Sequence, residues 1–110
     1  MLRPPESHTS GVTEAEFFWG PDFAGFEGHF PGDPILPGIA QIMAVALTAR
    51  PDGQAKLLQV GRTKFMGFVR PGDTMRIQAT LRDTDAGVQV SGECATENGV
   101  CAQIKILLTR

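Results

Sequence analysis

The segment that most constrains the fold of this chain is the apolar run from Pro37 to Arg50. Pro37 suits the first helical position, where its missing N–H costs nothing, and Pro51-Asp52-Gly53 ends the run. One helical face is formed by Ile39, Ile42, Met43, Ala46 and Leu47. The remaining faces are also apolar, which predicts a buried helix. A lone helix of this kind needs a sheet curled around it.

The sequence around this helix predicts strands and turns. Gly20–Pro37 is dense in Gly, Pro and Asp, and we expect this long irregular segment to be packed and ordered because it carries several aromatic and aliphatic residues. The predicted strands are Thr13–Trp19, Lys56–Phe65, Thr74–Arg82, Val88–Thr96 and Val100–Leu108. This order predicts an α+β fold with an antiparallel sheet around one central helix.

The last two strands form a hairpin, for which Asn98-Gly99 is a favoured two-residue turn. That turn predicts that Thr96 faces Cys101 and that Cys94 faces Gln103. The two cysteines are then not directly opposite each other. We therefore expect no disulfide, as is usual in a reducing cytoplasm.

The 110 residues suggest a single domain over residues 13–110, preceded by a flexible leader over residues 1–12. The formal net charge is -2 and no run of Lys or Arg occurs, which argues against a nucleic-acid partner. No apolar stretch has the length of a membrane span, and the polar N-terminus lacks the apolar segment of a signal peptide. We expect a cytoplasmic protein without a membrane partner.

His29 is the candidate catalytic residue, in a loop that leads to the N-terminus of the predicted helix. It is either a loop histidine held by backbone hydrogen bonds or a general base, the role that suits histidine at neutral pH. The unpaired N–H groups and the positive dipole at the helix start offer an oxyanion-type site at Gly38. The other histidine, His8, lies far away without a cysteine at a suitable spacing, so no metal site and no cofactor are expected.

The segment from Phe26 to Gly38 reads F-x-G-H-F-P-G-x-P-I-x-P-G. This string resembles the active-site loop of bacterial 3-hydroxyacyl-[acyl-carrier-protein] dehydratases. Lys64-Phe65 followed by V-x-P-G-D at residues 69–73 is similar to a strand-turn-strand segment of the same family. The similarity extends roughly over residues 13–108 in the order of elements.

The resemblance implies a hotdog fold, with protomers paired edge to edge as a homodimer or a higher oligomer. The implied reaction is the reversible dehydration of a 3-hydroxyacyl thioester to the 2-enoyl thioester. His29 would take the C2 proton and the Gly38 N–H would hold the thioester carbonyl, while an acid on the partner's helix handles the leaving hydroxyl. Phe30, Pro31 and Pro37 would contact the substrate.

This chain departs from the family at Met43, where the family has its Glu or Asp. A thioether cannot protonate a hydroxyl, and Met43 fits the packing of a core methionine or a substrate contact. Gln41, the nearby polar residue of the helix, is expected on a different face. Three hypotheses stay open: an impaired or partner-dependent dehydratase, a non-catalytic acyl-thioester-binding subunit of a heterodimer with an acid-bearing paralogue, and a hotdog thioesterase.

The substrate would be carried by an acyl carrier protein or by CoA. Carrier proteins are acidic, so Arg62, Lys64 and Arg70 are candidates for carrier docking, or else belong to a solvated strand face. Candidates for lining an acyl tunnel are Phe26, Phe30, Phe65, Met66 and Phe68.

Overall fold

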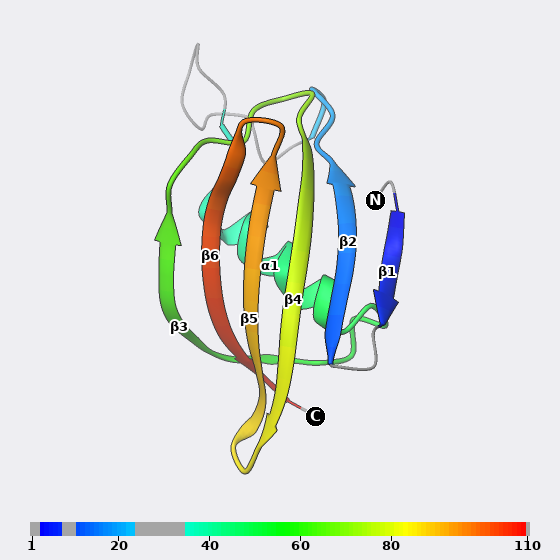
Figure 1. The fold of residues 1–110 in the computed structure, drawn as a ribbon, viewed down its shortest axis with the longest axis vertical. Helices are drawn as coiled ribbons and strands as arrows, with labels where there is room; N and C mark the ends of the chain where they lie inside the picture. Colours follow the sequence, from blue (N-terminus) through cyan, green and yellow to red (C-terminus); the bar gives the residue numbers. More distant parts are fainter. Residues whose placement is uncertain (1–2, 8–10, 24–34, 110) are drawn as a thin grey trace.

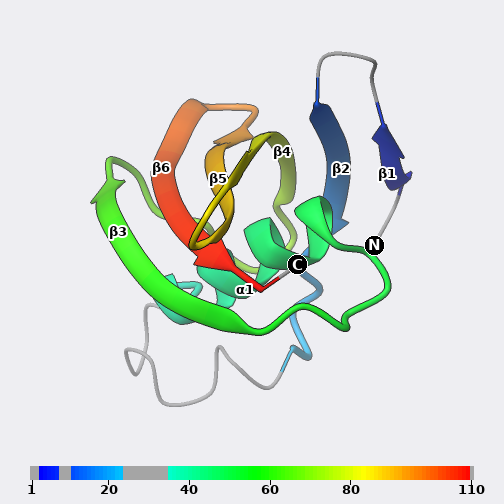
Figure 2. The ribbon, with the colours of Figure 1, turned by 90° about the horizontal axis from the view of Figure 1, so that it is seen from below.

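The computed structural model describes residues 3–7, 11–23 and 35–109. A six-stranded antiparallel sheet has the order β1-β2-β4-β5-β6-β3 and curls around one helix (Figures 1 and 2). In chain order, the elements are β1 (Arg3–Ser7), β2 (Val12–Phe18), α1 (Gly38–Ala49), β3 (Leu57–Phe65), β4 (Thr74–Thr84), β5 (Gly87–Thr96) and β6 (Gly99–Leu108). Within these residues, no helix has the length and apolar character needed to cross a membrane.

The helix α1 confirms the predicted central helix, but only one side of it is buried. Val45 and Thr48 are fully buried where α1 packs on β2, β4, β5 and β6. On the opposite side, Ile39, Met43 and Leu47 are 61%, 48% and 42% exposed. The expectations of a helix buried all round and of a core Met43 are therefore wrong for this chain alone. A single sheet can cover only one side of a helix.

The strands from β3 onward lie within two residues of their predicted bounds, and β4 shows the predicted alternation. Met75, Ile77 and Ala79 of β4 point into the core, while the residues between them are exposed. The pairing of β3 with β6 shifts register between Val60 and Thr63, around Gly61.

The N-terminal segment differs from the flexible leader that we expected. Arg3–Ser7 forms β1, which pairs antiparallel with β2 at one edge of the sheet. An edge strand tolerates proline because one of its sides has no partner strand. Accordingly, Pro4 and Pro5 lie where the register shifts between Arg3 and Glu6.

The last hairpin forms with a different register from the predicted one. Thr96 faces Gly99 and Cys94 faces Ala102, so Glu97 and Asn98 make the loop. The difference from the predicted partner is two positions at Thr96 and one at Cys94, because the register shifts between Cys94 and Ala95. The turn residues alone do not reveal this shift. Both cysteines are free and buried, and they are not opposite each other, as predicted.

Candidate active site

The predicted catalytic loop lies largely outside the described residues, which resume at Ile35. His29, Phe30 and Pro31 therefore stay predictions. Ile35 and Leu36 are buried, and the Leu36 N–H donates a 2.7 Å hydrogen bond to the Val69 carbonyl oxygen. This bond fixes the chain between the predicted loop and the start of α1.

Gly38 is the first residue of α1, and Pro37 is its N-cap in an extended conformation (φ -61°, ψ 146°). Pro37 was expected one position further on, as the first helical residue. Among the described residues no side chain caps this end, and the first turn carries no acidic residue. The N–H groups of the first turn and the positive end of the helix dipole are thus free of a competing carboxylate from this turn.

A cavity of about 390 Å³ opens beside Gly38. Three of the five predicted tunnel residues line it, namely Phe65, Met66 and Phe68, together with Ile35, Leu36, Gly67 and Gln41. The Phe65 ring lies directly over Gly38, because a Cβ atom placed there would be 2.8 Å from Phe65 Cζ. A side chain at position 38 would therefore collide with the ring, so glycine fits this backbone at the cavity wall.

Gln41 is the polar lining residue that sequence reasoning missed. It is only 3% exposed and lies on a different face of α1 from the exposed Met43, as expected, but no contact with the substrate was assigned to it. Its Oε1 atom is buried and accepts no hydrogen bond from the described residues. The signal in the sequence was the single amide in an otherwise apolar first half of the helix.

Met43 does not belong to the described lining of this cavity. It stands on the exposed side of α1 between Ile39 and Leu47, each one turn away. A second protein chain packed on this face would touch Met43 directly.

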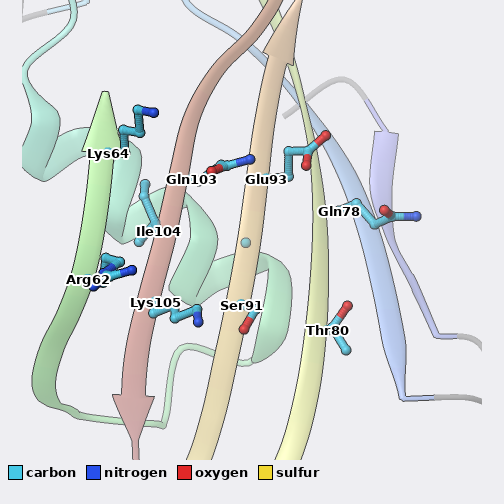
Figure 3. Close-up of a pocket in the computed structure, with 10 residues that line it drawn as sticks. Arg62, Lys64, Gln78, Thr80, Ser91, Glu93, Gln103, Ile104 and Lys105 are labelled. Atoms are coloured by element: carbon cyan, nitrogen blue, oxygen red, sulfur yellow. The ribbon is translucent and has the colours of Figure 1, made fainter. Parts of the chain in front are cut away.

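The three predicted docking residues lie in two places. Arg62 and Lys64 border a hollow of about 550 Å³ on the sheet surface, together with Lys105 and Glu93 (Figure 3). Polar side chains of β3, β4, β5 and β6 line it. Arg70 lies elsewhere, with its guanidinium carbon 5.4 Å from the centre of the Phe68 ring at the cavity beside Gly38. The described residues contain no cluster of His, Cys, Asp or Glu that could hold a metal ion.

Comparison with solved structures defines the class of protein by its fold. The dehydratase heterocomplex ApeI:P from Xenorhabdus doucetiae contains a chain with a TM-score of 0.81 at 24% identity, covering 96% of this chain and 94% of that one. The (R)-hydratase from A. caviae has a TM-score of 0.62 at 13% identity, covering 94% of this chain and 96% of that one. The chain has the hotdog fold, as predicted.

Sequence comparison then gives the family. A family model described as ApeI dehydratase matches residues 5–105. The 3-hydroxyacyl-[acyl-carrier-protein] dehydratase FabZ of Rickettsia bellii is 37% identical, over 73% of this chain and 67% of the relative. FabZ of Ligilactobacillus salivarius is 39% identical, over 67% of this chain and 59% of the relative. The chain belongs to the ApeI-like dehydratase family, and its function is of the 3-hydroxyacyl-[acyl-carrier-protein] dehydratase type.

Proposed function

We propose that this chain supplies half of a dehydratase site and that a second hotdog chain, with Asp or Glu at the position of Met43, supplies the other half. The observation that carries this proposal is the position of Met43 on the uncovered face of α1. A partner helix packed there would bring its own residues toward the site of this chain. In a homodimer, both helices would offer a methionine instead of an acid.

The proposed reaction divides its steps between the two chains. His29 takes the proton from C2 of the 3-hydroxyacyl thioester, while the Gly38 N–H and the start of α1 stabilise the charge that grows on the carbonyl oxygen. The partner's carboxylic acid gives a proton to the 3-hydroxyl, the C3–O bond breaks, and water leaves. The double bond forms between C2 and C3, which yields the 2-enoyl thioester.

Two findings support a partner chain. Large apolar side chains are exposed on the free side of α1 and on β3, which ends the sheet, and such a surface marks an interaction site. One of the structures with the same fold is described as a dehydratase heterocomplex. The cavity beside Gly38 has no carboxylate among its described lining residues, and this part of the lining therefore does not favour thioester hydrolysis.

The test compares the purified chain alone with the chain mixed with an acid-bearing paralogue. We expect little or no interconversion of 3-hydroxyacyl and 2-enoyl thioesters by the chain alone, and recovery on mixing, because losing a general acid costs about 10²- to 10⁴-fold in rate. Light scattering of the mixture should show a complex of the two chains. Full activity of the chain alone would contradict the half-site proposal.

Variants of the same chain sharpen this test. Met43→Glu should raise the activity of the chain alone by at least about tenfold, since it restores part of that loss, whereas the matched variant Met43→Gln adds an amide of similar size without an acid. His29→Ala should abolish the activity of the mixture. An equal gain from glutamate and glutamine would show that acid chemistry is not what Met43 lacks.

A further inference from the structure

The buried amide of Gln41 has no role in the steps assigned so far. Its Oε1 atom is one of two buried side-chain atoms that lack a hydrogen-bond partner among the described residues, and Trp19 Nε1 is the other. Burying an unpaired acceptor costs stability. A leucine at this position of the helix would avoid that cost, so the amide calls for an explanation.

The position of Gln41 suggests what its partner could be. Gln41 lies three residues after Gly38, which places both on neighbouring turns of the same side of α1. Both residues line the same cavity, and the other described side chains around it are apolar. The amide is therefore the one polar side chain in the described lining, one turn from the backbone assigned to the thioester carbonyl.

We propose that the Gln41 amide binds the 3-hydroxyl group of the substrate, an inference that rests on the proposed function. When the carbonyl at C1 lies at Gly38, the 3-hydroxyl is the next polar group of the acyl chain, two carbons further on. The chain beyond C3 is apolar and suits the rings of Phe65 and Phe68. A rotation about the terminal side-chain torsion, which is soft in glutamine, turns the amide toward the ligand.

The hydroxyl suits this site chemically because it both donates and accepts a hydrogen bond. Either orientation of the amide therefore finds a partner in it. Gln41 has no proton to give at neutral pH, so it selects and orients the 3-hydroxyacyl thioester, and the acid still comes from the partner chain. The saturated thioester lacks the hydroxyl and leaves the amide unpaired.

The experiment measures the Kd of two pantetheine thioesters of equal chain length, one 3-hydroxyacyl and one saturated. The protein is the complex with the paralogue, in a His29→Ala background so that the hydroxyacyl ligand is not consumed. We expect the hydroxyacyl thioester to bind about three- to tenfold more tightly, the range that one net hydrogen bond gives. Gln41→Leu should remove this preference and leave the Kd of the saturated thioester unchanged.

Each other outcome overturns the inference in a distinguishable way. If Gln41→Leu weakened the binding of both thioesters equally, Gln41 would have a packing role instead. If the leucine variant folds poorly, Gln41→Met, which keeps the length of the side chain, repeats the test. An absence of preference in the starting protein would reject the role of Gln41 and leave the half-site proposal standing. Failure of both thioesters to bind would reject the proposed function as well. The control Gln54→Leu makes the same change at an exposed turn and should alter neither Kd.

Discussion

At the scale of single residues, the core contains a thiol group whose pKa is far from its usual value. Cys94 is fully buried on β5 and faces the helix side of the sheet. Burial, reinforced by the nearby Cys101 and Glu93, raises the pKa of the Cys94 thiol to about 12. The thiol is therefore protonated at every physiological pH and acts as a small apolar side chain.

This pKa leads to a prediction about stability in alkali. The folded state keeps the proton of Cys94, whereas the unfolded chain releases it near the ordinary value of 9.0. The stabilisation is complete below pH 9 and is lost as the pH rises toward about 12, so the free energy of unfolding should fall across this window. Urea unfolding at a series of pH values measures it, and Cys94→Ala should show a smaller fall. An identical pH dependence in both proteins would contradict the assignment.

At the scale of elements, the contact between α1 and β5 depends on one glycine. A Cβ atom at Gly92 would lie 2.7 Å from a Val45 methyl group, closer than packed side chains approach each other. Val45 is fully buried and β-branched, so its side chain has little freedom to move. The helix therefore lies close to the sheet because position 92 has no side chain.

We expect Gly92→Ala to destabilise the protein by about 1–3 kcal/mol, the usual cost of overpacking a core. Val45→Ala alone should also destabilise it, through loss of buried methyl groups. In the double variant, the new methyl group at position 92 occupies the space vacated by Val45. The loss of unfolding free energy in the double variant should then be smaller than the sum of the losses in the two single variants. Additive costs would show that these side chains do not compete for the same space.

The sequence allowed the main elements of this fold to be predicted because their side chains repeat with a clear period. The alternation in Thr74–Arg82 and the apolar run after Pro37 each match the observed element closely. The strand β1 was missed because Pro4 and Pro5 suggest a loop, although its partner β2 is the next strand along the chain. The hairpin register was missed because a bulge, which no turn residue signals, moved the loop to Glu97 and Asn98.

The candidate site was predictable only where its chemistry is visible in residue type. The motif around His29 and Gly38 pointed to thioester chemistry, and the family comparison confirms that class. Gln41 was missed because a polar residue in a helix usually faces solvent, and only the packing shows that it is buried. The exposure of Met43 was missed for a related reason. An apolar helix face need not be buried within its own chain, because a second chain can cover it.

At the scale of the whole molecule, the two groups of basic residues imply different roles in carrier docking. In the proposed function, the cavity beside Gly38 admits the acyl arm, and the carrier protein would then bind near its rim. Arg70 lies there, over the Phe68 ring, whereas Arg62 and Lys64 border the hollow on the sheet surface. We therefore expect Arg70 to contribute more than Lys64 to the binding of an acidic carrier.

Charge reversal separates these two regions. Arg70→Glu should raise the KM of the mixed enzyme for carrier-bound substrate about tenfold or more, because an attraction to the acidic carrier becomes a repulsion near the entrance. Lys64→Glu makes a comparable change of charge on β3 and should have a smaller effect. Neither variant should alter the KM for the pantetheine thioester, which carries no protein.

The effect of Arg70→Glu should also weaken at high salt, since exposed charges are screened. An equal effect of both variants on the carrier-bound substrate would place the docking surface on the sheet instead, across the hollow that Arg62 and Lys64 share.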